Sequence, residues 1–458
     1  MDFWPDRDQA DVMTEMLRPG DAGYDQELAG FQTAVPRRPD VIVAAASAAD
    51  VVEAVRYAGE HDLPIAVQST GHGVAVPFEG GVLVTTHRMD GVRIDAETST
   101  ARVDAGVRWG AVIEAAAEYG LAPLSGSFPG VGVVGYTLGG GFSLLGRRYG
   151  LAADHVTAIE VVTADGELRR ATPDTERDLF WALRGGRDNF GIVTALEFGL
   201  VPVTRLYGGS LQFGTESLAT VLRAWRDWTA GMPREMTSSL AMVPMPDLPM
   251  VPGPLRGKHV AQIRIAYLGD AAEGGRLVAP LRAAAPPLGD TLAEIPFTES
   301  GSIANEPPFP HGYRADNATV SELNDTMLDA ILDHAGPDAP VPTVVLLDLL
   351  GGALSDPPEH PGVGWDREAR FTVRALSVVD DAGTAAINAA HGKLFDALKP
   401  WSTGKLLTFV YGDSDAGTEA SKVYSPADLR RLAEVKAAVD PANRFRLTHN
   451  VEPARDAG

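Results

Sequence analysis

One histidine stands where an imidazole can react with a bound group. His72 lies between Gly71 and Gly73, directly after the apolar, strand-like run PIAVQ. The two glycines let the main chain approach a phosphate closely, and the hydroxyls of Ser69 and Thr70 can donate hydrogen bonds to it. By position alone, a histidine in a turn is more often a hydrogen-bonding residue than a reactive one. Its chemistry therefore depends on what the other glycine-rich segments bind.

A second segment, SFPGVGVVGYTLGGG, holds six glycines within twelve residues. Gly130, Gly132 and Gly135 have the spacing of the dinucleotide-binding fingerprint, which needs a strand before it and a helix after it. We reject that interpretation because LSGSFP precedes the motif and a glycine triplet at 139–141 follows it, each glycine costing a helix about 1 kcal/mol. Main chain held against a flat or charged ligand explains the glycines better, since its N–H groups would be donors. The interleaved valines and leucine argue against the alternative of a flexible surface loop.

A third glycine-rich turn, RGGRDNFGIV, contributes the Asn189 side chain and the main-chain groups of residues 190–193. Three turns of this kind are hard to explain as separate surface loops. Together they predict one large site for a ligand that has both anionic groups and a ring system, as a flavin dinucleotide has.

The composition narrows the classes of function. The chain has 458 residues, enough for two or three domains, and no apolar run reaches the roughly 18 residues of a membrane-spanning helix. A net charge of −22 would repel a nucleic acid backbone. Without cysteine there is no disulfide, thiolate nucleophile or zinc–thiolate site, and we expect no metal. The acidic start, MDFWPDRDQADVMTEM, lacks the pattern of a secretory leader, so we expect a cytoplasmic protein.

The elements that must position these residues differ between the two parts of the chain. From residue 37 to about 204, short strands alternate with helices. ADVVEAVRYAGEHDLP is predicted to be a helix capped by Asp50, and Asp165-Gly166 marks a hairpin turn. From about 205 to 422, long strands lie between helices, which is typical of one sheet with helices on a face. The tail is predicted to be a helix that begins at the cap Ser425 and stops before Pro441.

Four segments, in their order along the chain, carry a resemblance to a known family. PIAVQSTGHG, GVGVVGYTLGGGFSLLGRRYGLAADHV, FWALRGGRDNFGIVT and DPANRFRLTHNVEP resemble the berberine bridge enzyme-like branch of the vanillyl-alcohol oxidase flavoproteins. The resemblance implies FAD and an α+β, two-domain PCMH-type FAD-binding fold. An α/β substrate domain, an antiparallel sheet covered by helices, would be inserted between the two parts of the FAD domain. We expect an FAD-binding part at 1–204, a substrate domain at 205–422 and a returning C-terminal segment at 423–458.

The resemblance also implies roles for particular residues. The turn 68–73 would be the pyrophosphate loop, and His72 the imidazole that many members attach to the flavin 8α-methyl carbon. Phe128 occupies the place of the cysteine that forms a second flavin bond in some members, so only a single bond is expected. Segment 131–141 would run along the ring and the pyrophosphate. The implied cofactor-binding residues are Gln68, Ser69, Thr70, Gly71, His72, Gly73, Val131, Gly132, Gly135, Tyr136, Gly139, Gly140, Gly141, Asp154, Asn189, Gly191, Ile192, Val193 and Asn450.

The catalytic base departs from the family pattern. Oxidases of this branch often carry one tyrosine after the glycine triplet and another in a late strand, where a phenolate can take a substrate proton. Phe142 occupies the first place and Leu407 with Phe409 the second, and none of these side chains can accept a proton. Tyr411, expected on the same strand face as Leu407 by its spacing, is our first candidate to replace them. Tyr136 is a second candidate, although it is equally compatible with a packing role.

His449 is the third candidate for catalysis. With Thr448 and Asn450 it replaces an asparagine and a glutamine that the family often carries beside the flavin pyrimidine edge. A histidine there could donate to the negative charge that develops on the reduced ring. A capped tail with surface polar residues explains the same residues equally well.

These observations predict an FAD-dependent oxidoreductase. We expect it to take hydride from an alcohol or amine carbon of a hydrophobic small molecule, with molecular oxygen as the final acceptor, in natural-product or other secondary metabolism. The alternative is a redox-neutral flavoprotein cyclase that keeps FAD as a wall of its pocket, because cyclisation needs proximity and orientation more than a base. A flavin carrier without enzymatic activity would leave the inserted domain unexplained.

Overall fold

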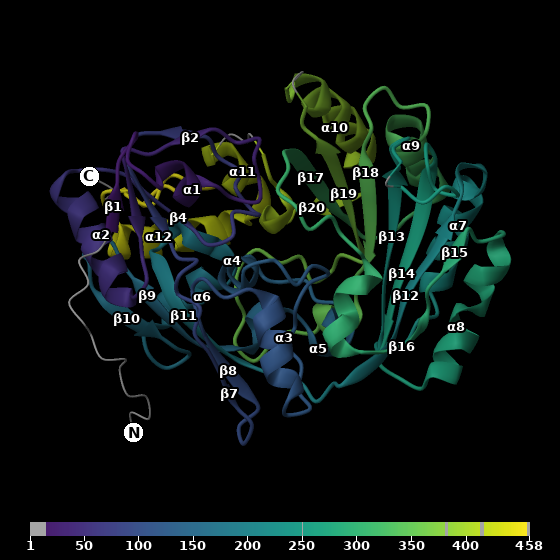
Figure 1. The fold of residues 1–458 in the computed structure, drawn as a ribbon, viewed down its shortest axis with the longest axis horizontal. Helices are drawn as coiled ribbons and strands as arrows, with labels where there is room; N and C mark the ends of the chain where they lie inside the picture. The colour runs from purple at the N-terminus through teal and green to yellow at the C-terminus, as the bar shows by residue number, and fades with distance from the viewer. Residues whose placement is uncertain (1–14, 250, 381–382, 413–415, 456–458) are drawn as a thin grey trace.

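The computed structural model describes residues 15–249, 251–380, 383–412 and 416–455. The acidic start discussed above, up to residue 14, lies outside the described residues. Figure 1 shows two lobes: one combines residues 15 to about 204 with the C-terminal helices, and the other is built from the middle of the chain. In the described part of the chain, no helix combines the length and the apolar character needed to cross a bilayer.

The first lobe contains two larger sheets, beside the two-stranded pair of β2 (Arg37–Arg38) and β5 (Phe78–Glu79). A four-stranded sheet has the order β1 (Glu15–Leu17), β3 (Val41–Ala44), β6 (Val82–Thr85) and β4 (Ile65–Gln68). β3 and β4 run parallel to β6, while β1 is antiparallel to β3. A five-stranded antiparallel sheet has the order β10 (Leu168–Ala171), β9 (Val156–Val162), β11 (Ile192–Gly199), β8 (Thr100–Asp104) and β7 (Val92–Asp95). The predicted hairpin is confirmed, because β9 and β10 pair across a turn in which Gly166 has φ +75°.

Helices join these sheets into one core. They are α2 (Ala48–Glu60), α3 (Trp109–Ala117), α6 (Arg177–Gly186) and α12 (Pro426–Val439). Trp109, Phe180 and Phe190 are fully buried among them. The prediction that Asp50 caps α2 is wrong: Ser47 is the N-cap, and Asp50 is the third residue of a capping box in which each side chain binds the other's main-chain N–H. The tail helix α12 is capped by Ser425 as predicted.

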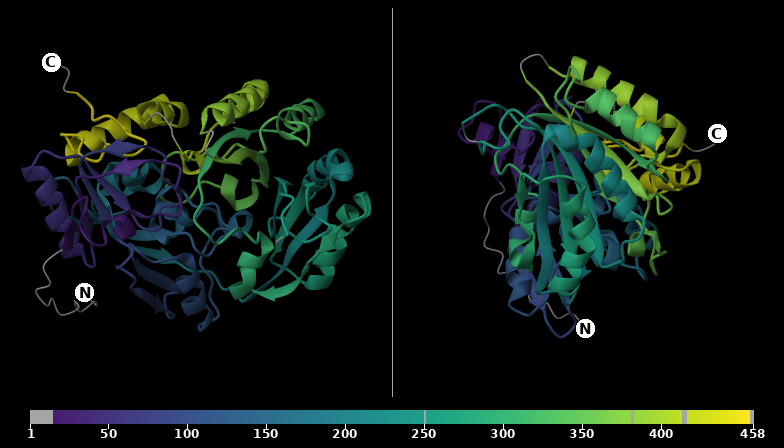
Figure 2. Two further views of the ribbon diagram at one scale, coloured as in Figure 1. Left: turned by 45° about the horizontal axis from the view of Figure 1, so that its top comes forward. Right: turned by 90° about the vertical axis from the view of Figure 1, so that its right-hand side faces the viewer.

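The second lobe is built on one long antiparallel sheet. Among the described residues it has nine strands, in the order β15 (Gly289–Asp290), β12 (Arg205–Phe213), β14 (His259–Tyr267), β13 (Met236–Pro244), β18 (Val344–Leu349), β19 (Phe371–Val378), β17 (Tyr313–Val320) and β20 (Ser402–Gly404), with β16 (Ala293–Pro296) also paired to β12. Four helices cover one face, as Figures 1 and 2 show: α7 (Leu218–Thr229), α8 (Ala271–Ala284), α9 (Asp325–Ala335) and α10 (Ala385–Leu398). This arrangement confirms the predicted fold class.

Strand periodicity decides which side chains of the long sheet reach the site. Ile263, Leu347 and Val373 point to the helices and are buried with Trp225 of α7. Their neighbours in sequence therefore face the first lobe. The chain divisions at 204 and 422 remain our proposal for the domain limits. Other short elements include α1 (Tyr24–Leu28), α4 (Val133–Leu138), α5 (Gly146–Tyr149), α11 (Ala416–Val423), and the 3-10 turns η4 (Phe297–Ile303) and η7 (Leu407–Phe409).

One buried arginine fixes the first lobe against the long sheet. Arg147 of α5 donates hydrogen bonds to the carbonyl oxygens of Met236 at 2.7 Å, Met232 at 3.2 Å and Leu350. Burial lowers its pKa to about 10. An ion pair of 2.7 Å between Asp154 and Arg367 is a second connection. These contacts hold the uncovered face of the sheet opposite the glycine-rich turns.

Candidate functional site

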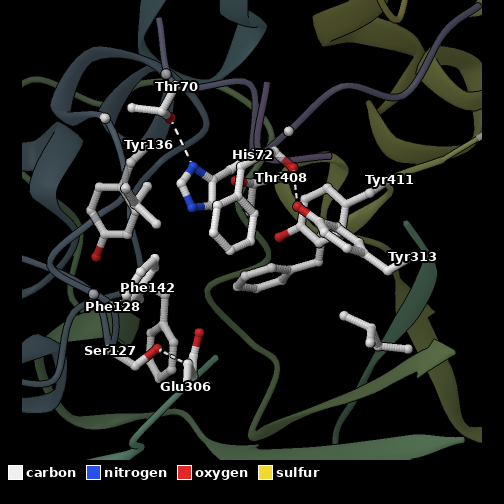
Figure 3. A pocket seen from close by; sticks show the side chains of 18 of the residues that line it. Thr70, His72, Ser127, Phe128, Tyr136, Phe142, Glu306, Tyr313, Thr408 and Tyr411 are labelled. Carbon is white, nitrogen blue, oxygen red and sulfur yellow. Dashed lines mark hydrogen bonds between the residues drawn. The ribbon is translucent and has the colours of Figure 1, made fainter. Parts of the chain in front are cut away.

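A cavity of about 920 Å³ lies between the glycine-rich turns of the first lobe and the uncovered face of the long sheet. The turn after β4, segments of 126–144 and part of 187–193 line it from one side (Figure 3). Residues of β14, β18 and β19 line it from the other. The predicted site residues that line it are Gln68, Ser69, Thr70, Gly71, His72, Gly73, Val131, Gly132, Gly135, Tyr136, Gly191, Val193, Tyr411 and His449.

His72 is fixed by a stacked ring and a hydrogen bond, and one of its ring nitrogens has no hydrogen-bond partner among the described residues. Its ring stacks on Phe31, with centroids 3.9 Å apart, and its Nδ1 lies 2.8 Å from Thr70 Oγ1 (Figure 3). Nε2 is buried and has no hydrogen-bond partner among the described residues. Burial, with the positive charges of Arg108 and His311, lowers the pKa of His72 to about 4. The imidazole is therefore neutral at physiological pH, and its unpartnered nitrogen is available to a bound group.

The glycine-rich segment 130–141 contains a short helix, although its glycines were expected to disfavour one. Residues 133–138 form α4, which begins after Gly132 and ends at Gly139. The glycine triplet stops this helix instead of preventing it. In the described part of the chain, no strand leads directly into this helix. Gly132, just before it, makes an isolated bridge to Arg108. A Cβ on Gly135 would meet no protein atom within 4 Å, which leaves this turn of main chain open to a ligand.

Three polar atoms on this side of the cavity lack a partner among the described residues: Ser69 Oγ, His72 Nε2 and Tyr136 Oη. Each is buried, so leaving it unsatisfied costs about 1 to 3 kcal/mol. A ligand that supplies acceptors and donors at these atoms removes that cost. The cavity volume, the open main chain at Gly135 and these atoms together fit FAD, whose phosphates and ring carry such groups.

Tyr136 and Tyr411 occupy different parts of this cavity. Tyr136, in α4, packs edge-on to Trp109 at 5.3 Å, and burial raises its pKa well above 10. The expectation that Tyr411 lies in a regular strand is wrong. It follows the 3-10 turn η7 and makes one isolated bridge with Ala315, while the main chain of Leu406, just before η7, is hydrogen-bonded to the Asn317 side chain.

Two of the three C-terminal candidates, Thr448, His449 and Asn450, reach the cavity. Thr448 and His449 line it, and Thr448 Oγ1 donates to Asp188 at 2.8 Å. Asn450 is buried outside the lining and donates to Glu452. Asn189 lies outside the lining as well. Its side chain bonds the main chain of His449 and Val451, so it positions the C-terminal segment.

The other predicted cofactor residues that do not line the cavity have structural contacts. Ile192 is fully buried in β11. Asp154 accepts from the main chain of Leu151 and pairs with Arg367. Gly139, Gly140 and Gly141 form the turn after α4, where a Cβ on Gly141 would strike the Tyr136 ring. Their cofactor roles remain predictions that this geometry does not support directly.

One wall of the cavity carries charged side chains that were not predicted from the sequence. Arg264, Asp348 and Arg374 project from β14, β18 and β19, and Glu306 comes from the loop before β17. Arg374 pairs with Asp348, with Nε 2.8 Å from Oδ2. A signal with a period of two residues was available for the three strand residues, because each interrupts an apolar strand at a position that faces away from the helices.

Tyr313, also missed, links the two sides of the cavity. Its hydroxyl donates to the main-chain oxygen of His72 at 2.6 Å, and its ring meets Tyr411 edge-on at 5.8 Å (Figure 3). Phe142, in a place where related oxidases carry a phenol, lines the cavity and stacks on Trp365 at 6.3 Å. The phenols of Tyr313 and Tyr411 therefore approach the cavity from the sheet side, and the Phe142 ring approaches it from the glycine-rich side.

Comparisons with known proteins agree with this geometry. A family model described as FAD binding domain matches residues 39–172, and one described as berberine and berberine like matches residues 410–452. The chain is 28% identical to (R)-6-hydroxynicotine oxidase of Paenarthrobacter nicotinovorans, covering 96% of this chain and 97% of that protein. It is also 28% identical to xylooligosaccharide oxidase of Thermothelomyces thermophilus, covering 93% and 89%.

Solved structures show the same fold. The crystal structure of 6-hydroxy-D-nicotine oxidase from Arthrobacter nicotinovorans superposes with a TM-score of 0.83 at 27% identity, over 97% of this chain and 98% of that one. Xylooligosaccharide oxidase from Myceliophthora thermophila gives 0.84 at 24% identity, over 96% and 98%. With both matched segments at the cavity and similar FAD-linked oxidases that span its length, the chain carries an FAD-binding domain and a berberine-like C-terminal segment and is an FAD-dependent oxidoreductase.

Proposed function

We propose that this chain is an oxidase that takes hydride from an alcohol or amine carbon of a small molecule, with molecular oxygen as the final acceptor. When bound, FAD supplies the hydride acceptor. The observation that carries the proposal is the position of Tyr411, whose hydroxyl makes no hydrogen bond among the described residues and whose ring lines the cavity. A phenolate there takes the substrate proton as the hydride leaves.

The surroundings of Tyr411 support this role. Burial raises the pKa of Tyr411 to about 12, and the guanidinium groups of Arg374 and Arg187 oppose that rise. Arg374 is held in place by Asp348 and lies over the Phe409 ring at 4.3 Å. Positive charge on two sides therefore favours the ionised phenol more than a buried tyrosine would otherwise allow.

We further propose that the substrate has a hydrophobic body. Val344, Leu346 and Leu376 face the cavity from neighbouring strands, and Phe142 faces it from the first lobe. The relatives include oxidases named for a nicotine derivative and for oligosaccharides, so the fold accommodates substrates of different polarity. A place in natural-product metabolism and in the cytoplasm, expected from the sequence, remains part of this proposal.

The test is reduction of the bound cofactor. Purified holoenzyme is mixed without oxygen with a panel of aromatic alcohols and secondary amines, and its absorbance near 450 nm is followed before and after air is admitted. We expect bleaching by at least one class of compound, recovery in air and formation of hydrogen peroxide. Tyr411→Phe should slow the bleaching by about 100-fold, the size of a general-base contribution, while the exposed control Tyr119→Phe should not. If Tyr411→Phe bleaches at the same rate as the wild type, Tyr411 is not the base of this reaction.

One observation favours the redox-neutral alternative. The two places where related oxidases carry phenols hold Phe142, which lines the cavity, and Leu407, which is buried in η7. A cyclase needs a shaped wall and no base, so apolar residues there would suit it. Conversion of a polyene substrate while the absorbance of the cofactor stays fully oxidised would support the cyclase and contradict the oxidase.

A further inference from the structure

We propose that the cavity selects substrates that carry a carboxylate, and that Arg264 on β14 binds this group. The inference rests on the proposed function only in taking the cavity as the substrate site. The expected substrate is then an amphipathic organic acid, which has a carboxylate in addition to the proposed hydrophobic body. Its basis is an arginine that is enclosed by protein and yet has most of its donors unused.

Arg264 faces the cavity with little help from the protein. Its side chain is only 12% exposed. Nε donates to Gln262 Oε1 at 3.2 Å, which fixes the plane of the guanidinium. Neither Nη atom makes a hydrogen bond to a described residue, and the nearest carboxylate oxygen, on Glu306, is 3.9 Å from Nη1. Buried charged groups are normally paired and hydrogen-bonded, so this geometry calls for an external acceptor.

Arg374 on β19, which two strands separate from β14 in the sheet, provides the contrast. Asp348 lies against it with two contacts, at 2.8 and 3.1 Å, and also accepts a hydrogen bond from Thr372. Against the lowering effect of burial, Asp348 raises the pKa of Arg374. Burial instead lowers the pKa of Arg264. The chain therefore compensates one of its two cavity arginines internally and leaves the other for a ligand.

Glu306 does not fill this role because it is held from the other side. Its Oε1 accepts a hydrogen bond of 2.6 Å from Ser127, on the first lobe (Figure 3). At 3.9 Å, Glu306 offsets part of the positive potential around Arg264 but is too far away to accept a hydrogen bond from the guanidinium. A ligand carboxylate at Arg264 would therefore approach with mild repulsion from Glu306, a feature that an experiment can use.

A second donor lies next to Arg264. Ser239 on β13 is directly opposite it in the sheet register and also lines the cavity. Its hydroxyl makes no hydrogen bond to the residues that the structure describes. A planar guanidinium fork with a neighbouring hydroxyl matches the two oxygens of a carboxylate. Because the whole chain has a net charge of −22, attraction of an anion to this cavity must come from such local groups.

The test uses benzoate and its neutral counterpart benzamide as probes. Each is titrated into FAD-loaded protein, and binding is measured by calorimetry and by the change in the cofactor absorbance spectrum. We expect benzoate to bind and benzamide to bind at least about tenfold more weakly, as the loss of a charged hydrogen-bonded pair implies. Arg264→Gln should weaken benzoate by at least about tenfold, Arg264→Lys should retain part of the affinity, and the exposed control Arg205→Gln should change nothing.

A second variant gives an effect of opposite sign. Glu306→Gln removes the nearby negative charge and should strengthen benzoate binding several-fold while leaving benzamide unchanged. Equal binding of the two probes, benzoate affinity that survives Arg264→Gln, or displacement of benzoate by xylobiose but by no organic acid would each overturn the inference. Because calorimetry needs no turnover, these outcomes are separate from failure of the proposed oxidase reaction, which would appear as absence of bleaching by every reducing substrate.

Discussion

Tyr313 donates a hydrogen bond of 2.6 Å from its hydroxyl to the main-chain oxygen of His72, so the long sheet directly supports the loop that holds the imidazole. Tyr313→Phe removes that bond and keeps the ring packing. We expect a loss of about 1 kcal/mol in the free energy of unfolding and a lower ratio of flavin to protein. Thermal unfolding and absorbance of the purified protein measure the two effects. Tyr119→Phe, an exposed tyrosine, is the matched control.

The unpartnered Nε2 of neutral His72 predicts a single covalent bond to the cofactor. After acid precipitation, the wild-type pellet should stay yellow and fluoresce on a denaturing gel. His72→Ala should release all its flavin to the supernatant, and His311→Gln, which removes another histidine of the same aromatic cluster, should not. A wild-type pellet that loses its colour would show that the site binds FAD without a bond.

The raised pKa of Tyr411 predicts a particular pH dependence. Only the phenolate accepts a proton, and its fraction increases with pH up to the pKa of about 12. The rate of anaerobic bleaching should therefore rise by about tenfold per pH unit across the alkaline range without reaching a plateau. Arg374→Met removes an opposing positive charge, so its rate should be lower at every pH. A rate independent of pH would point to a substrate that loses its proton without this residue.

Local signals in the sequence were sufficient for some elements and failed for others. The hairpin turn at Asp165-Gly166 and the cap Ser425 depend on neighbouring residues, and both were predicted correctly. The cap of α2 was misplaced because Ser47 and Asp50 bind each other's main chain, and either residue type can begin a helix.

The residues of the candidate site also fall into those that a local motif predicts and those that depend on contacts distant in sequence. Loop 68–73 and Gly132 carry motifs that pointed to a binding site, and they line the cavity, while their contacts with the cofactor remain a prediction. Tyr411 was assigned to a strand because the bonds from Asn317 to Leu406, between residues 89 apart in sequence, cannot be seen in a local pattern. Arg264 was missed for a related reason: only the pairing of strands shows which face of the sheet meets the first lobe.

Burial of His391 predicts a loss of stability in acid. This residue lies between α10 and the sheet, with Nε2 3.1 Å from Ser377 Oγ, and burial together with the charge of Arg314 lowers its pKa to about 4. The unfolded chain binds the proton near pH 6.5, so the free energy of unfolding should fall as the pH drops from about 6.5 to 4. We expect His391→Gln to make unfolding by urea less sensitive to pH across this range. Equal sensitivity in both proteins would mean that other groups cause the loss.

A fully buried ion pair holds the C-terminal segment at the site. Lys436 Nζ lies 2.7 Å from Asp440 and donates to the main-chain oxygens of Asn189 at 2.6 Å and Phe445 at 3.0 Å. Lys436→Met leaves the Asp440 charge buried without its counterion. The expected cost is about 3 to 5 kcal/mol in the free energy of unfolding, with weaker retention of FAD because Asn189 positions His449.

The double variant Lys436→Met with Asp440→Asn separates charge from packing. If the uncompensated carboxylate causes the loss, neutralising it should restore stability in part, because the single amide oxygen can still accept from one of the two main-chain N–H groups, of Arg444 and Phe445, that now bind separate carboxylate oxygens. Urea unfolding of the four proteins in the cycle gives the coupling energy between the two side chains. A double variant less stable than Lys436→Met alone would show that Asp440 acts chiefly through those main-chain bonds, and that the lysine supports the segment through Asn189 and Phe445.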